Sequence, residues 1–135
     1  MSPEQRILLR QIFERLVPLP KQFGQTFYER LFELDPSLRE LFKGDLDRQA
    51  SMLANALTLA VVQLTQDGRI APTVRELGKR HANYGIDDAS YETFGKALAW
   101  TFERTLGDEF TPKVRAAWEE AYQMLSQAMR STTAG

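Results

Sequence analysis

Residues 47–65 read DRQASMLANALTLAVVQLT, and one period runs through the whole segment. Its apolar side chains recur at steps of three and four residues, which is the repeat of an amphipathic α-helix. The recurring positions, which form a broad apolar face, are Met52, Leu53, Ala56, Leu57, Ala60, Val61 and Leu64. Asp67 and Gly68 follow the pattern and end it, because glycine readily takes the left-handed conformation that closes a helix. The segment therefore predicts a long helix, the most buried one in the chain.

The same period continues on both sides of this segment. Helical repeats cover 3–17, a stretch after Pro20 that ends at Leu34, a short turn at 36–42, and then 72–84, 88–106 and 112–130. The segment that ends at Leu34 has a predicted apolar stripe formed by Phe23, Phe27, Leu31 and Leu34. The segment at 88–106 has a second stripe, formed by Tyr91, Phe94, Leu98, Thr101 and Thr105. No segment alternates with the period of two that is typical of β-strands. We expect one all-α domain over residues 1–135, with 131–135 as a disordered polar tail.

Composition excludes several classes of protein. The chain has 135 residues, 17 basic and 18 acidic side chains, a formal net charge of -1 and no cysteine. Thiolate metal sites and disulfides are excluded, and the absence of a basic stripe argues against nucleic acid as a partner. The N-terminus lacks a signal-peptide pattern, and the longest apolar run, 56–64, is too short and too polar to span a membrane. We expect a cytoplasmic protein with no membrane partner.

The single histidine, His81, lies on the predicted apolar face of the helix at 72–84. On spacing alone, the commoner interpretation is a core histidine that is hydrogen-bonded to a carbonyl or a hydroxyl. The functional interpretation is an axial ligand to haem iron, since a neutral imidazole suits that role and helices can enclose a flat apolar cofactor. A zinc or non-haem iron site built from several histidines is excluded.

Four segments resemble one known family. They are FYERLF at 27–32, DPSLRELF at 35–42, LGKRHANYGI at 77–86 and AWEEAY at 117–122. In this order and spacing they resemble a single-domain bacterial haemoglobin of the globin family, similar to the haem domain of flavohaemoglobins and to neuroglobin-like bacterial globins. The resemblance implies a globin fold, with six to seven helices in a three-over-three sandwich around haem b.

The resemblance also implies a role for each matching residue. His81 would be the proximal ligand to the haem iron, and Phe42 would pack on the porphyrin. On the distal side Tyr28 and Gln49 would donate hydrogen bonds to the bound ligand, next to Leu53. The other residues implied to contact the cofactor are Leu77, Arg80 as the partner of a haem propionate, Tyr91 near the proximal imidazole, and Tyr122. Lys43 and Arg48 are weaker candidates at the rim, and ordinary surface charge is the alternative for all three basic residues.

Three functions remain open at this point. The first is binding of oxygen, CO or NO at ferrous iron for oxygen storage, delivery or scavenging, with polar donors favouring oxygen over CO. The second is an enzyme, a nitric oxide dioxygenase or nitrite reductase, in which Tyr28 and Gln49 would be the catalytic candidates. The third is a haem-free or sensor signalling domain of globin shape.

Two features of the sequence favour binding over catalysis. The chain stops at Gly135 without the reductase of flavohaemoglobins, so we expect an enzyme of this kind to need an external reductase. Flavohaemoglobins also carry a late glutamate near the proximal imidazole, whereas no acidic residue follows Glu120 here. A monomer and a homodimer are equally compatible with the sequence.

Overall fold

The computed structural model describes residues 1–16, 20–42, 44–67, 69, 72–83 and 87–130. Within these ranges, only the backbone is described at Leu16, Pro20, Asp67, Thr73, His81, Ala82 and Asn83. The predicted tail at 131–135 and the predicted helix end near Tyr84 lie outside the described residues. So do Lys43 and the glycine expected to close the long helix, Gly68.

Helices account for all the regular secondary structure in the described part of the chain. They are α1 (Pro3–Leu16), α2 (Pro20–Leu34), the 3-10 helix η1 (Pro36–Leu41), α3 (Leu46–Asp67), α4 (Pro72–Asn83), α5 (Asp88–Leu106), the 3-10 helix η2 (Gly107–Glu109) and α6 (Pro112–Arg130). Five of them begin at a proline, because a proline at the first helical position loses no intrahelical hydrogen bond. The predicted all-α fold class is confirmed.

Side-chain caps start several of these helices. Ser2 and Gln5 form a capping box, in which the Gln5 amide donates to Ser2 Oγ (3.1 Å) and the Ser2 amide donates to Gln5 Oε1 (2.9 Å). Asp87 caps α5 by accepting a hydrogen bond from the Ser90 amide at 2.9 Å, and Asp35 caps η1 in a similar way. These local signals explain why the sequence alone predicts the helix starts well.

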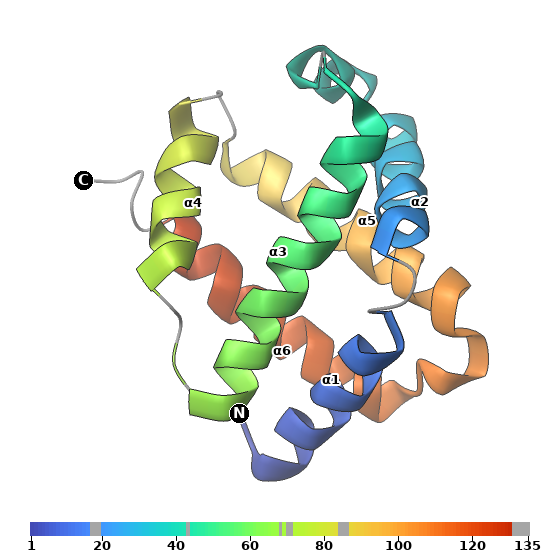
Figure 1. Cartoon of the computed structure of the whole chain (residues 1–135), viewed down its shortest axis with the longest axis vertical. Coiled ribbons are helices and arrows are strands. Elements are labelled where there is room, and N and C mark those ends of the chain that lie inside the picture. Colours follow the sequence, from blue (N-terminus) through green and yellow to red (C-terminus); the bar gives the residue numbers. More distant parts are fainter. Residues whose placement is uncertain (17–19, 43, 68, 70–71, 84–86, 131–135) are drawn as a thin grey trace.

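The helices form two layers, with α1, α3 and α4 over α2, α5 and α6. Helix α3 packs on α1 and α2, α4 packs on α6, and α2 packs on α5. Figure 1 shows α3 running across the front of the molecule, with α5 and α6 behind it. This is the three-over-three arrangement that the resemblance implied.

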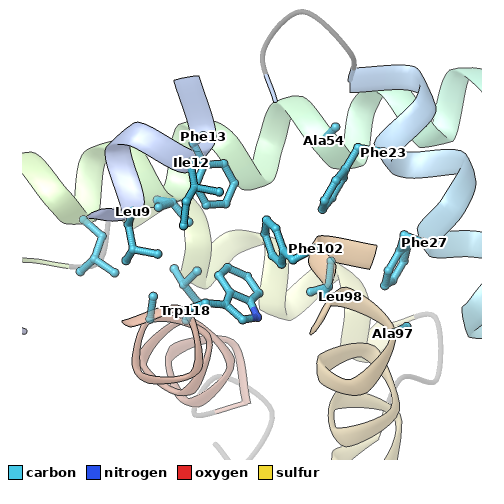
Figure 2. Packing of buried hydrophobic residues seen from close by; sticks show 14 of the residues in the cluster. Leu9, Ile12, Phe13, Phe23, Phe27, Ala54, Ala97, Leu98, Phe102 and Trp118 are labelled. Atoms are coloured by element: carbon cyan, nitrogen blue, oxygen red, sulfur yellow. The ribbon is translucent and has the colours of Figure 1, made fainter. Parts of the chain in front are cut away.

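An aromatic cluster holds the two layers together at one end. Phe102 of α5 lies at its centre, 4.7 Å from the Trp118 ring, 5.1 Å from Phe23 and 5.7 Å from Phe13, measured between ring centroids. Figure 2 shows these four rings meeting from α1, α2, α5 and α6. All four are essentially buried, so this cluster is the main hydrophobic anchor of the fold.

Two glycines allow helices to cross at very short range. A Cβ atom at Gly24 of α2 would lie 2.2 Å from the Ala50 carbonyl oxygen of α3. At Gly78 of α4 it would lie 2.4 Å from the Met129 carbonyl oxygen of α6. Backbone therefore meets backbone at both crossings. These contacts set the positions of α3 and α4, the helices that carry Gln49 and His81.

The apolar face predicted for α3 is partly wrong. Met52 is 54% exposed and Ala56 is also exposed, whereas Ala50 and Ala54, which the period had left out, are buried. Apolar residues occur nearly all around this helix, so its period alone does not say which side meets α1 and α2. Two other predicted inward residues also lie outside the core, because Leu34 is 39% exposed and Thr105 is exposed.

Candidate functional site

A cluster of aromatic rings surrounds Tyr28 on α2. The Tyr28 side chain is only 5% exposed, and its ring lies edge-on to Phe42 with 5.1 Å between centroids. Phe32, one helical turn further along α2, stacks on Tyr28 at 5.8 Å and also contacts Phe42. Phe42 reaches this cluster because η1 turns the chain back after Asp35. Two of the predicted site residues, Tyr28 and Phe42, are therefore in direct contact.

Gln49, near the start of α3, joins the same cluster by a hydrogen bond to the Tyr28 phenol. Burial raises the pKa of Tyr28 to about 12, and the Gln49 hydrogen bond acts in the opposite direction. A hydrogen bond that lowers a phenol pKa stabilises the phenolate, so the effect of Gln49 is opposite to that of burial. With a pKa this high, the Tyr28 phenol keeps its proton at pH 7 and can donate a hydrogen bond.

Next to this polar pair, α3 presents an apolar side that its own neighbours do not cover fully. Leu53 and Leu57 lie one and two turns after Gln49 and are half-buried, and Ala56 between them is exposed. Phe42 is half-buried at the edge of the same region. A flat apolar group with one polar ligand on its face is the kind of cofactor that these residues fit. Tyr28, Gln49 and the half-buried apolar residues beside them therefore fit a haem.

A second pair of tyrosines lies where α5 begins. Tyr91 is buried in the first turn of α5, and the Tyr122 hydroxyl of α6 donates to its carbonyl oxygen at 2.5 Å. The Tyr122 ring lies over Gly95, where a Cβ atom would come within 2.8 Å of it. Burial raises the pKa of both phenols, and the Arg130 guanidinium lies 5.9 Å from the centre of the Tyr91 ring. These contacts hold the start of α5 on α6.

Aromatic contacts connect the two tyrosine groups through Phe94 and Phe27. The Phe94 ring is 5.9 Å from Tyr91 and 6.4 Å from Phe27, and Phe27 is 5.0 Å from Tyr28. Neither Phe94 nor Phe32 is among the predicted site residues. Helical spacing was the available signal, because Phe94 follows Tyr91 by three residues and Phe32 follows Tyr28 by four.

The remaining predicted residues are distributed along α3 and α4. Leu77 is half-buried on α4, and Arg80, near the end of the same helix, is exposed. Arg48 is exposed on α3. His81 belongs to α4, three residues after the close crossing at Gly78, and its side chain lies outside the described residues. Its role as an iron ligand stays a prediction.

Comparison with known proteins places the chain in a family. The Globin family model matches residues 25–129, and the chain therefore belongs to the globin family. Membership supports haem as its cofactor. Within the described residues, no helix is both long enough and apolar enough to cross a membrane.

Two kinds of relative stand out among similar proteins. A flavohemoprotein of Bacillus subtilis (strain 168) is 34% identical over 125 residues, which cover 87% of this chain and 31% of the relative. A flavohemoprotein of Oceanobacillus iheyensis is 29% identical, and 30% of its length is covered, so the chain spans about a third of these relatives. Anaerobic nitrite reductase HBII of Casuarina glauca is 28% identical over 146 residues, covering 96% of this chain and 90% of that protein.

A solved structure shows the same fold. The flavohemoglobin of Malassezia yamatoensis, determined with bound FAD and heme, aligns with a TM-score of 0.85 over 97% of this chain and 36% of that chain. Its sequence identity is 21%, so this likeness concerns the fold. The predicted globin fold is confirmed.

Proposed function

We propose that this chain is a single globin domain that holds haem b and binds diatomic gases, oxygen foremost, for storage, delivery or scavenging. The observation that carries the proposal is the buried Tyr28 phenol, which has Gln49 as a hydrogen-bond partner and lies beside a partly uncovered apolar side of α3. A haem-free domain has no use for a buried donor placed against such a surface. A haem-free signalling role is therefore disfavoured.

Residues of three elements would hold the cofactor. Phe42, Leu53 and Leu77 supply apolar contacts, Arg80 pairs a propionate at the rim, and His81 binds the iron from the α4 side. When bound, haem supplies a ferrous iron with an open coordination position that takes oxygen, CO or NO. Tyr122 positions Tyr91, and Tyr91 in turn orients the proximal imidazole.

Tyr28 sets the preference among these gases. Its phenol is protonated at neutral pH, and burial raises its pKa further, so it can donate a hydrogen bond. A donor in a dry pocket favours a polar ligand over a nearly apolar one such as CO. One hydrogen bond of about 1.5–3 kcal/mol corresponds to a tenfold to more than hundredfold change in affinity. Gln49 fixes the orientation of the phenol through its hydrogen bond.

Absorbance spectroscopy of the protein supplied with haemin tests cofactor binding. We expect a Soret band that shifts on reduction and again on addition of CO. His81→Ala is expected to lose this normal spectrum and to recover it when free imidazole is added. Absence of a Soret band in the parent protein, or an unchanged spectrum in His81→Ala, would contradict the proposal.

Stopped-flow measurement of oxygen dissociation tests the role of Tyr28. We expect Tyr28→Phe to release oxygen about tenfold to a hundredfold faster, because it loses the donor and keeps the ring. Thr101→Val is the matched control, since it also removes a buried hydroxyl, but one bonded to the Ala97 carbonyl oxygen of α5. Equal oxygen dissociation rates in Tyr28→Phe and the parent protein would contradict the role proposed for Tyr28.

A second candidate function is turnover of nitric oxide or nitrite with electrons from a separate reductase. The match to a nitrite reductase along nearly its whole length favours this candidate, as do the flavohemoprotein relatives. Many turnovers per haem with a cellular reductase in the cytoplasm would support it. A single stoichiometric reaction of the oxygenated protein with nitric oxide would support binding alone.

A further inference from the structure

The last turn of α6 brings a positive charge to the start of α5. Arg130 is the final residue of α6, and its side chain is half-buried. Its guanidinium carbon lies 5.9 Å from the centre of the Tyr91 ring. The terminal carbonyl groups of a helix carry partial negative charge and stabilise a cation in the last turn, so α6 favours a basic side chain at this place. The proposed function assigns no role to Arg130.

The crossing of α4 and α6 holds the same turn of α6 against the helix that carries His81. The Met129 backbone, one residue before Arg130, is the backbone that a Cβ atom at Gly78 would meet at 2.4 Å. Gly78 lies three residues before His81, which is less than one turn of α4. Figure 1 shows the end of α6 passing behind α4. The backbone of this turn therefore contacts α4, and the side chain of Arg130 reaches α5.

The charge of Arg130 acts on both phenols at this junction. Burial raises the pKa of Tyr91, the Arg130 charge lowers it, and the weaker effect of the Asp88 carboxylate raises it. Burial also raises the pKa of Tyr122, and Arg130 again acts in the opposite direction. Because Arg130 outweighs Asp88 at Tyr91, the electrostatic potential at the start of α5 is positive.

We propose that Arg130, a fixed positive charge where α4, α5 and α6 meet, favours the ferrous form of the iron that His81 would bind. The inference rests on the proposed function, because it concerns the iron of the proposed cofactor. Ferric iron carries one more positive charge than ferrous iron, so a nearby cation destabilises the ferric form more. In the reduction, one electron passes from an external donor, such as the separate reductase considered above, to the ferric iron. No bond or proton changes at Arg130. The charge thus helps to keep the protein in the state that binds gases.

Redox titration of the whole chain reconstituted with haemin tests this role. The protein is equilibrated with redox dyes, and the ratio of ferrous to ferric protein is read from the Soret band at each potential. At a fixed potential, Arg130→Gln should lower this ratio about threefold to tenfold, the effect of a half-buried charge that solvent screens in part. A tenfold change corresponds to about 59 mV for one electron. Arg130→Glu should lower the ratio further, whereas Arg130→Lys should stay within about twofold of the parent protein, because it keeps the charge.

Arg104→Gln is the matched control. Arg104 also lies in the last turn of its helix, and its guanidinium carbon is 4.6 Å from the centre of the Trp100 ring. It is at the opposite end of α5 from Tyr91, about 20 Å away along the helix axis. Its removal should leave the ratio of ferrous to ferric protein unchanged, because solvent screens an exposed charge over such a distance. Circular dichroism melts and the Soret band of the CO complex verify that each variant is folded and holds the cofactor as the parent protein does.

The outcomes distinguish this inference from the proposed function. Absence of a Soret band in the parent protein would overturn both. If the parent protein binds haem normally, equal ratios in the parent, Arg130→Gln and Arg130→Glu would overturn the inference alone. A shift in Arg130→Lys as large as that in Arg130→Gln would also overturn it, because the effect would then follow the shape of the side chain and not its charge. An equal shift in Arg104→Gln would do the same.

Discussion

The position of α4 depends on its close crossing with α6 at Gly78, and substitution of this glycine tests that dependence. A Cβ atom built on Gly78 would lie 2.4 Å from the Met129 carbonyl oxygen and 2.7 Å from its Cα atom. These neighbours are backbone atoms, so no side-chain rotation relieves the overlap. Ordinary contact distances require the two helices to separate by about 1 Å. Gly78→Ala is therefore expected to displace the helix that carries His81.

Two opposing energies decide the size of the effect. Alanine in a helix interior is favoured over glycine by about 0.5–1 kcal/mol. Overpacking a well-filled contact costs about 1–3 kcal/mol. Subtracting the gain from the cost gives a loss of about 0–2.5 kcal/mol in the free energy of unfolding, and we expect the upper half of this range because the overlap is with backbone atoms. Because α4 moves, we also expect weaker haem retention in the reconstituted protein.

Chemical denaturation of the haem-free protein measures the stability, and haem transfer to an acceptor globin measures retention. Gly44→Ala is the control, since a Cβ atom there has nothing within 4 Å. Gly24→Ala should resemble Gly78→Ala in stability, because its Cβ would meet the Ala50 backbone at 2.2 Å. If Gly78→Ala were as stable as the parent protein, the reasoning from backbone contact would be refuted.

Three further predictions concern stability. The pKa of Tyr28 is raised to about 12 in the folded state, so the unfolded chain loses this proton first as the pH rises. Tyr28 should therefore lower the free energy of unfolding by about 2 kcal/mol between pH 10 and 12, and denaturant titration should show a smaller fall in Tyr28→Phe. The hydrogen bond from the Ser90 amide lowers the pKa of the Asp87 carboxyl. The ionised carboxylate therefore stabilises the fold above the ordinary aspartate pKa, and this stabilisation is lost as the pH falls. In thermal melts, the melting temperature of Asp87→Ala should decrease less steeply with falling pH than that of the parent protein. Phe102→Ala should cost about 3–5 kcal/mol at the centre of the aromatic cluster, and a cost below 1 kcal/mol would mean that the cluster is not the anchor.

Local signals in the sequence account for most of the fold. Prolines act on their own helix within one turn, so the helix starts at Pro36, Pro72 and Pro112 can be predicted without any tertiary information. The helical period likewise identifies which segments are helices. The family resemblance then assigned the haem and the expected roles of His81 and its neighbours. For His81 itself, that assignment stays a prediction.

Only the packing of the helices decided which side of each one became core and which residues met. The period of α3 could not tell the buried Ala50 and Ala54 from the exposed Met52, because apolar residues occur nearly all around the helix. Gln49 reaches Tyr28 across 21 positions of sequence because Gly24 lets α2 and α3 cross backbone to backbone. Leu34 is exposed, although the period of α2 had placed it on the inward stripe. Contacts between distant segments depend on the crossing geometry of whole helices, whereas a local pattern records only the neighbours along one helix.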